Sequence, residues 1–356
     1  ILISMASQSQ TKQWTLKECV LYALENNISV KQSELDVELT DVEKLTAIGN
    51  FLPDLNASGA VSANTGLSFN PLTNSPQTTT FLSASGRITS NYTIFNGLRN
   101  FREVQRAKIS KIAAQFRLSK MKDDISLFVA NNFLQVILNK ANLEVLKTQN
   151  IVTKEQLQRT NDLVDAGVLP RGDLLEIQAT DASEKQAIVA AENTIEVSLI
   201  SLAQLLLIKD YKNFDIKDEG YDIIDNSIAD KSVYDIIDSA KENRNEVKIA
   251  EKNVELAQKD VQLAKGANLP TISAFFGYDT RYTDASTFAT RLDQANPIVT
   301  QQIGVVEGTG QAVIGEFPNT VTQVVGADPF FNQLYQNDGI AYGLQMNITI
   351  FNGFAT

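Results

Sequence analysis

The 356-residue sequence contains no histidine and a single cysteine, Cys19. Histidine is the side chain that most often moves protons, activates nucleophiles and binds zinc, so its absence argues against an enzyme and against a metal or other cofactor. A hydrolase that uses only carboxylates remains chemically possible, but no pair of acidic residues lies in an apolar, pocket-like segment. Cys19 has no partner for an intrachain disulfide and lies in an amphipathic run, where we expect a small core residue.

Positive charge and long apolar runs are also scarce. Lys and Arg number 31 against 42 Asp and Glu, a net charge of −11, so the attraction to phosphate on which nucleic-acid binders rely is lacking. After the N-terminal residues, no window offers the roughly 18 uninterrupted apolar residues of a membrane-spanning helix. The 43% apolar content is still sufficient for a packed core. If the protein enters a membrane, it does so as β-strands.

The first ten residues resemble the remnant of a signal peptide. Residues 1–3 are apolar, small residues follow, and residues 8–10 are polar. A frayed terminus is the alternative. We expect residues 1–10 to be a signal-peptide remnant and the protein to be exported.

A duplicated segment organises the chain. Thr15 and Glu18 have the spacing of a capping box, and adding 217 to each number gives Ser232 and Asp235, which carry the same signature. The same offset relates a set of identical pairs: Ala23/Ala240, Glu25/Glu242, Asn26/Asn243, Val30/Val247, Gly49/Gly266, Leu52/Leu269 and Pro53/Pro270. Residues 93–97 recur letter for letter as residues 349–353, with an offset of 256, so the second copy is 39 residues longer between these anchors (256 − 217). The pattern indicates two tandem repeats.

The expected organisation follows from these anchors. Residues 11–231 form the first repeat, and residues 232–356 form an incomplete second repeat. The predicted elements are helix 15–49, strands 52–66 and 81–95, a helical hairpin over 98–207, an equatorial segment over 208–231, helix 232–266, and strands 270–282 and 338–351. If the second repeat mirrors the first, its helical hairpin of roughly a hundred residues is missing after Gly353.

The predicted strands alternate apolar and polar residues, which indicates one apolar and one polar face. The alternatives are a half-buried sheet of a soluble protein and an outer-membrane barrel. We favour the barrel, because the polar faces carry Ser, Thr and Asn, and aromatic residues collect near strand ends. The aromatic residues expected at the membrane interface are Tyr92, Tyr278, Tyr282 and Tyr342. Residues 283–337, rich in Gln, Asn and Gly, would then form a long outward-facing loop.

The hairpin prediction rests on the spacing of apolar residues and on two breaks. Residues 98–166 contain no Gly or Pro, and a helix of that length is a rod of roughly 100 Å. Gly167 and Pro170 mark its end, and Asp173 with Glu176 marks the start of the returning helix. We therefore expect a long antiparallel helical hairpin.

Four strands cannot close a barrel, because about eight is the smallest number whose side chains fill the interior. Open strand edges in lipid would leave peptide groups unpaired at a cost of several kcal/mol each. Other copies must therefore complete the sheet. The predicted fold is an α+β membrane protein in which three copies, with four strands each, form a trimeric 12-stranded β-barrel that continues into a long α-helical coiled-coil barrel.

In this order, and duplicated, the motifs resemble the TolC family of outer-membrane efflux proteins over residues 14–353. They are the Ala-x-Glu-Asn helix, the Leu-Pro start of a strand, a strand-to-helix turn and the Gly-Val-Leu hairpin tip. The turn residues are Phe95, Asn96 and Gly97 in the first repeat and Phe351, Asn352 and Gly353 in the second.

The resemblance implies a homotrimer in outer-membrane lipid, with its helices in the periplasm, that serves as a passive exit duct for efflux or type I secretion. It also implies two partners, a periplasmic adaptor and an inner-membrane pump of the RND or ABC type. In relatives the hairpin tip meets the adaptor through a Val-Gly-Leu type motif. Here Ala166, Gly167, Val168 and Leu169 occupy that position, so the first Val is replaced.

Two alternatives stay open. Asp162 and Asp165 near the tip could add negative potential around a constriction and give a modest cation preference, or they are solvated helix residues. Asp173 is expected to be only a helix N-cap. The alternative function for the whole chain is a trimeric outer-membrane adhesin with a coiled-coil stalk, but strand pairs inside two repeated helical units favour a through-channel.

Overall fold

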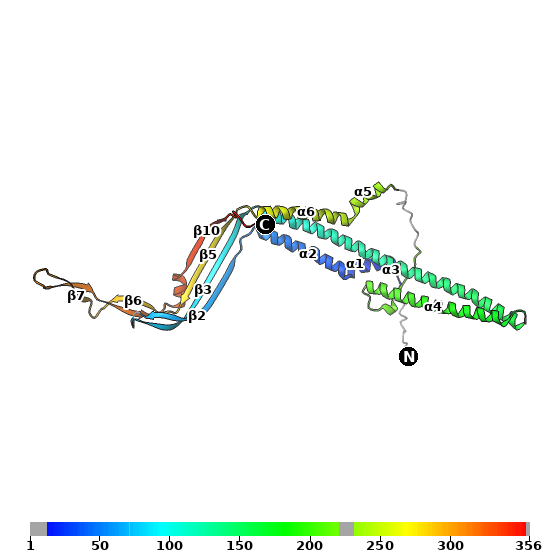
Figure 1. Cartoon of the computed structure of the whole chain (residues 1–356), viewed down its shortest axis with the longest axis horizontal. Helices are drawn as coiled ribbons and strands as arrows, with labels where there is room; N and C mark the ends of the chain where they lie inside the picture. The colour runs from blue at the N-terminus through cyan, green and yellow to red at the C-terminus, as the bar shows by residue number, and fades with distance from the viewer. Residues whose placement is uncertain (1–12, 71, 221–230, 354–356) are drawn as a thin grey trace, which may run out of the picture. The chain divides into compact units, whose positions relative to one another are not determined.

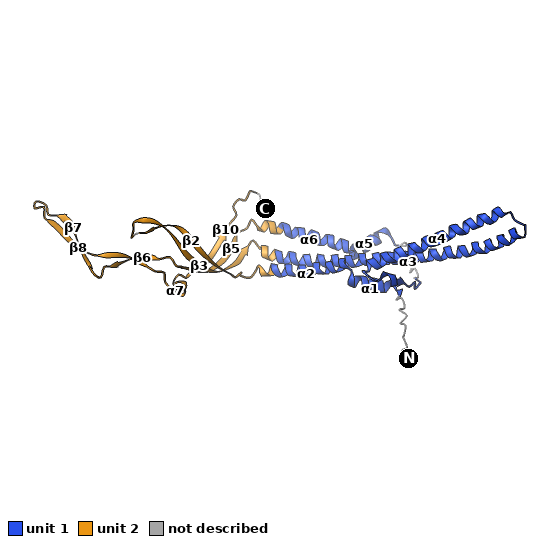
Figure 2. Cartoon of the chain, turned by 90° about the horizontal axis from the view of Figure 1, so that it is seen from below, with its two compact units in different colours: residues 1–46, 103–261 blue, residues 47–102, 262–356 orange. Residues whose placement is uncertain are grey.

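The computed structural model describes residues 13–70, 72–220 and 231–353. The chain divides into two compact units, which Figure 2 colours separately. The helical unit comprises residues 1–46 and 103–261, and the sheet unit comprises residues 47–102 and 262–356. The expected signal-peptide remnant and residues 221–230 of the expected equatorial segment lie outside the described residues.

Figure 1 labels most of the elements. The described helices are α1 (Leu16–Asn26), α2 (Ile28–Gly49), α3 (Arg99–Asp165), α4 (Arg171–Leu205), the 3-10 turn η1 (Tyr211–Asn213), α5 (Val233–Asn243), α6 (Asn245–Gly266) and α7 (Phe330–Gln336). The described strands are β1 (Gln13–Trp14), β2 (Asn56–Asn70), β3 (Ser75–Asn96), β4 (Asp215–Ile216), β5 (Thr271–Thr283), β6 (Thr287–Leu292), β7 (Ile298–Val305), β8 (Ala312–Pro318), β9 (Thr320–Val325) and β10 (Gly339–Asn347).

The capping signature predicted at Thr15 is confirmed. The Thr15 side chain accepts a hydrogen bond from the Glu18 N–H (3.2 Å), and the Glu18 carboxylate accepts one from the Thr15 N–H (3.0 Å). At the returning helix of the hairpin the sequence prediction is wrong, because α4 begins at Arg171 with Pro170 as its N-cap. Asp173 lies in the first turn instead, where its negative charge is favourable for the helix dipole.

The single helices predicted over 15–49 and 232–266 are each interrupted once. Asn27 and Arg244 adopt extended backbone (ψ 131° and 125°) and end α1 and α5. The Asn27 side chain then accepts a hydrogen bond from the Ser29 N–H (2.9 Å), which caps the start of α2. The bounds of α5 and α6 equal those of α1 and α2 plus 217, the offset found in the sequence.

The core of the helical unit lies where α1, α3, α4 and the residues after α4 meet. Cys19 is buried there, as predicted, together with Phe133 and Leu202. Trp14 packs at the edge of this core, with its ring centroid 5.1 Å from that of Tyr22. The removal of these apolar side chains from water is the main favourable contribution to folding of the unit.

Residues 208–220 of the expected equatorial segment contain η1 and β4. β4 pairs in parallel with β1. The Lys140 ammonium of α3 holds this segment by an ion pair with Asp215 (2.5 Å) and a hydrogen bond to the Ile216 carbonyl (3.1 Å). Residues 215 and 216 are therefore bound to α3 of the helical unit.

A four-stranded antiparallel sheet with the order β10-β5-β3-β2 forms the base of the sheet unit. It contains the four strands expected from the sequence, with different bounds. β2 and β3 close a tight hairpin across Asn70 and Ser75, so both continue beyond the predicted ends at 66 and 81. β10 ends at Asn347, before the predicted end at 351. β2 and β10 are the two edge strands.

Residues 283–337, predicted as a loop, contain regular structure. β6 pairs with β9 and β7 pairs with β8, in two separate antiparallel ladders, and α7 follows. Val, Ile, Thr and Phe are frequent in these strands, and such residues favour extended backbone. The segment is therefore an ordered extension of the sheet unit.

Of the described helices, α4 is long and apolar enough by composition to cross a membrane. It carries Glu192, which forms an ion pair with Lys147 of α3 (3.0 Å), and its Leu202 is buried in the core of the helical unit. Because these contacts bind α4 to the rest of the helical unit, we interpret it as one half of the helical hairpin.

Candidate functional site: sheet face, turns and hairpin tip

The cross-strand register gathers the apolar residues of the four strands on one face of the sheet. One row across the sheet consists of Ala57, Ile88, Tyr278 and Ile340. Residues two apart along a strand lie on the same face, so the other alternating apolar residues join this surface, which we call the apolar face. On β10 it includes Tyr342, Leu344 and Met346, which are 80%, 72% and 62% exposed. Contiguous exposed apolar surface of this kind marks a contact with lipid or protein.

The opposite face of the sheet is polar. The next row consists of Ser58, Arg87, Asp279 and Gly339. Further along the β2–β3 pair, the hydroxyl groups of Ser62 and Ser83 are hydrogen-bonded to each other (2.8 Å). One face of the sheet therefore suits water and the other suits hydrocarbon.

The four tyrosines predicted at the membrane interface all lie on the apolar face, but at different heights. Tyr92 is level with Ala274 of β5, and Tyr282 lies eight residues further along the same strand (282 − 274). At about 3.4 Å per residue the two tyrosines are about 27 Å apart, close to the roughly 25 Å height of the apolar band of outer-membrane barrels. Tyr342 lies near the Tyr92 end and Tyr278 lies midway. Tyr92 and Tyr282 thus lie near opposite ends of the apolar face, and the role of the four tyrosines as membrane-interface residues stays a prediction.

The turn that leads from β3 into α3 contains the predicted residues Phe95, Asn96 and Gly97. The Asn96 side chain accepts a hydrogen bond from the Asn100 N–H (3.3 Å) and so caps α3. Gly97 has φ +69°, in the left-handed region that favours glycine. A Cβ at this position would lie 2.2 Å from the carbonyl oxygen of Gly266. Both the backbone conformation and the close approach of α6 therefore require glycine here.

The second copy of the turn, Phe351, Asn352 and Gly353, lies beyond the end of β10. Gly353 has φ +66°, as in the first copy. Nothing lies within 4 Å of the position that a Cβ would take at Gly353. The two copies thus share a backbone conformation.

The predicted docking tip is a single compact turn formed by Ala166, Gly167, Val168 and Leu169. The Val168 N–H donates to the Leu163 carbonyl and the Gly167 N–H donates to the Val164 carbonyl, both at 2.9 Å. With Gly167 at φ +76°, this is a Schellman motif at the end of α3. Val168 is 66% exposed. The turn residues 166–169 therefore present an uncharged, apolar projection.

The tip carboxylates Asp162 and Asp165 are exposed in the last turn of α3. Each accepts a hydrogen bond from an amide four residues earlier, Gln158 to Asp162 (3.0 Å) and Asn161 to Asp165 (3.1 Å). Amide donors orient the carboxylates without neutralising their charge.

A buried polar cluster that sequence reasoning missed joins α3 to α4. The amide of Asn150, which is 3% exposed, donates to Asp181 (2.9 Å) and to Glu184 (3.0 Å). Thr153 also donates to Glu184 (2.9 Å), and the Lys185 ammonium binds the second oxygen of Asp181 (2.6 Å). Hydrogen bonds from Lys185 and then from Asn150 lower the pKa of Asp181 below its usual value. Asn150 and Asp181 are 31 residues apart, so no local spacing rule could have paired them.

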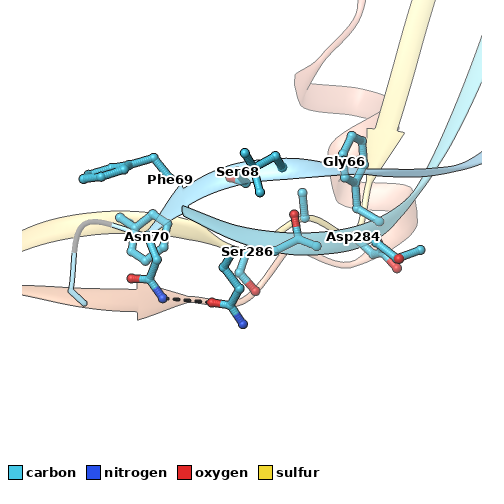
Figure 3. A pocket seen from close by; sticks show the side chains of 13 residues that line it. Gly66, Ser68, Phe69, Asn70, Asp284 and Ser286 are labelled. Carbon is cyan, nitrogen blue, oxygen red and sulfur yellow. Dashed lines mark hydrogen bonds between the residues drawn. The ribbon is translucent and has the colours of Figure 1, made fainter. Parts of the chain in front are cut away.

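A cavity of about 470 Å³ lies where the β2–β3 hairpin meets residues 284–288 (Figure 3). Asn70 and Gln77 at its wall are hydrogen-bonded to each other (3.2 Å). The carboxylate of Asp284 accepts a hydrogen bond from the Leu82 N–H (2.5 Å), so it stabilises the fold. Among the described residues, no group of three or more Cys, Asp or Glu side chains is placed to hold a metal ion.

Comparison with known proteins identifies the family. The family model of outer membrane efflux proteins matches residues 21–206, more than half of the chain. The chain belongs to the outer membrane efflux protein family. This membership confirms the resemblance inferred from the motifs and the predicted outer-membrane location, and it agrees with the prediction that the protein is not an enzyme.

Solved structures share the fold of this outer membrane efflux protein at low sequence identity. CusC has a TM-score of 0.68 at 15% identity, with 95% of this chain and 66% of CusC covered. VceC from Vibrio cholerae has a TM-score of 0.65 at 14% identity, with 95% of this chain and 69% of VceC covered. CmeC from Campylobacter jejuni has a TM-score of 0.63 at 15% identity, with 90% of this chain and 63% of CmeC covered. The chain thus spans about two thirds of the length of these structures. No curated protein sequence matches it.

Proposed function

We propose that three copies of this chain form a 12-stranded barrel in the outer membrane, which continues into a helical barrel in the periplasm and serves as a passive exit duct. The observation that carries the proposal is a four-stranded sheet with one continuous apolar face and two unpaired edge strands, β2 and β10. CusC is described as forming a transmembrane channel and CmeC as an outer membrane channel, and this chain shares their fold.

The unpaired edges of the sheet explain why the proposal requires several copies. An unpaired peptide group in hydrocarbon costs several kcal/mol, so β2 and β10 need partners. Neighbouring strands alternate in direction across the order β10-β5-β3-β2, and β10 therefore runs antiparallel to β2. β10 of one copy can continue the antiparallel ladder onto β2 of the next. Three copies supply twelve strands, and rotational symmetry closes the barrel.

The same symmetry would gather the α3–α4 hairpins into a tube. We place the adaptor contact at the exposed turn formed by Ala166, Gly167, Val168 and Leu169. The periplasmic adaptor would connect this tip to an inner-membrane pump of the RND or ABC type in an efflux or type I secretion system. The equal offset of 217 between the helix bounds of α1 and α2 and those of α5 and α6 supports an origin by tandem duplication.

A proline substitution on β10 tests the subunit contact. The peptide groups of Arg281 and Thr283 bind side chains of α7 on the β10 side of β5. Peptide groups alternate in direction along a strand, so the N–H of Gly339 faces β5 and that of Leu344 faces the free edge. Leu344→Pro therefore removes a donor to the neighbouring copy and none within the chain.

We expect the full-length protein with Leu344→Pro to be monomeric in detergent, whereas Leu344→Ala, which keeps the N–H, remains trimeric. Size-exclusion chromatography with light scattering measures the mass. A trimer that tolerates the proline would contradict the proposed subunit contact. Wild-type trimers should also give conductance steps in planar bilayers, and trimers that never conduct would favour the adhesin stalk.

A further inference from the structure

Helix α7 covers a part of the sheet that has no strand partner. Pairing between β10 and β5 stops at Gly339 and Asp279, whereas β5 continues to Thr283. The Gln333 side chain binds the peptide group of Thr283 twice, accepting from its N–H (3.0 Å) and donating to its carbonyl (2.8 Å). Asn337 donates to the Arg281 carbonyl (3.1 Å). Two amide side chains thus replace the missing ladder and protect the exposed strand edge.

α7 also lies against the apolar face. Thr280 and Tyr282 belong to the same alternating set of β5 as Tyr278 and therefore share that face. The Thr280 hydroxyl donates to the Leu334 carbonyl (2.7 Å), and the rings of Tyr282 and Phe330 meet edge to face at 4.9 Å. The helix therefore covers the end of the apolar face that is about 27 Å from Tyr92.

The outer side of α7 is aromatic and uncharged. Phe331 and Tyr335 are four residues apart, so they lie on one side of the helix, and they are 71% and 82% exposed. No charged residue occurs between Asp328 and Asp338. Two large exposed aromatic side chains beside neutral amides, at the end of an apolar surface, match the chemistry of the boundary between lipid headgroups and acyl chains.

We propose that α7 is an interfacial anchor, with Phe331 and Tyr335 in contact with phospholipid at the rim of the barrel that is farther from α3 along β3. The inference rests on the proposed function, because it requires the apolar face to lie in a bilayer. It goes beyond that function by assigning the lipid boundary at this rim to a helix, in addition to the strand aromatics.

Three substitutions of equally exposed tyrosines test it. Tyr335 on α7, Tyr342 on the apolar face of β10 and Tyr234 on α5 are 82%, 80% and 81% exposed. Each is replaced by Trp in the full-length protein, reconstituted into phosphatidylcholine vesicles that carry bromine either near the headgroup end or near the methyl end of the acyl chains. Trp14 is the native tryptophan, so the spectrum of the parent protein is subtracted.

We expect Tyr335→Trp to lose about half of its emission, with stronger quenching by bromine near the headgroup. Tyr342→Trp should be quenched by at least one of the two lipids, and Tyr234→Trp by neither. Quenching at position 342 without quenching at position 335 would overturn the inference about α7 and leave the proposed function standing. Blue-shifted but unquenched emission at 335 would show that protein, such as a neighbouring copy, covers α7. Unquenched emission at both positions would refute the proposed function itself.

Discussion

Alanine at Gly97 tests whether the turn between β3 and α3 is built around a close backbone approach. In the left-handed region alanine costs about 1–2 kcal/mol relative to its preferred conformations. Its Cβ would also lie 2.2 Å from the Gly266 carbonyl oxygen and 2.9 Å from the Leu269 Cβ, where ordinary contacts begin near 3.4 Å. Moving the backbone apart to relieve such overpacking costs about 1–3 kcal/mol. The sum is about 2–5 kcal/mol for Gly97→Ala.

Gly167→Ala is the matched control, because Gly167 also has a left-handed φ (+76°) but no atom within 4 Å of the new Cβ. We expect it to cost only the conformational part, about 1–2 kcal/mol. Amide hydrogen exchange of peptides next to each turn reports local opening. Gly97→Ala should accelerate exchange in β3 by roughly 30- to 4,000-fold, against roughly 5- to 30-fold in the last turn of α3 for Gly167→Ala. Equal acceleration by the two substitutions would refute the role assigned to the close approach.

Three further predictions concern the helical unit. Phe133→Ala removes a fully buried side chain and should lower the free energy of unfolding by about 3–5 kcal/mol, with a much smaller loss for Phe133→Leu, as measured by urea unfolding followed by circular dichroism. Because the pKa of Asp181 is lowered below its usual 3.8, the stability it contributes is present above that value and is lost as the pH falls through the lowered pKa. The unit should therefore unfold at lower urea near pH 3 than near pH 6, and Asp181→Asn should reduce this difference. The double substitution Asp162→Asn with Asp165→Asn should weaken a modest cation preference in bilayer recordings, and an anion-selective channel unaffected by it would contradict the role of the tip charges.

Local sequence signals predicted those features whose cause is itself local. Gly167 followed by Pro170 located the hairpin turn, because a left-handed glycine ends a helix through two local hydrogen bonds, one from its own N–H and one from the N–H of Val168. Thr15 with Glu18 located a helix start, because the two residues of a capping box bind each other's backbone N–H groups. The alternation in β2, β3, β5 and β10 predicted the apolar face, since the pleat fixes side-chain direction and a one-residue slip in register would mix the two faces. The strand order β10-β5-β3-β2 could not be predicted from the sequence and comes from the structure.

The missed features have causes that no short window contains. Asn27 interrupts a periodic helical run with one side-chain cap, and apolar periodicity continues across it. α7 has seven residues, too few for a helical period to stand out. Gln333 binds the peptide group of Thr283 only because β5 extends beyond its pairing with β10. The cluster around Asn150 and Asp181 depends on the antiparallel packing of α3 against α4.

Both units, considered separately, leave large apolar side chains uncovered. In the helical unit, Leu127 and Phe128 of α3 are 62% and 58% exposed, and Val197 of α4 is 63% exposed. The sheet unit exposes its apolar face and has two unpaired edges. A soluble monomer would leave all of this surface in water, at a cost of about 25 cal/mol for each Å² of apolar area. Lipid would cover the apolar face of the sheet and α7, but it could not pair a strand edge or cover a helix in the aqueous periplasm. The proposed rotation of identical copies about one axis would satisfy every requirement at once, because each β10 would meet a β2 and each hairpin would meet another hairpin.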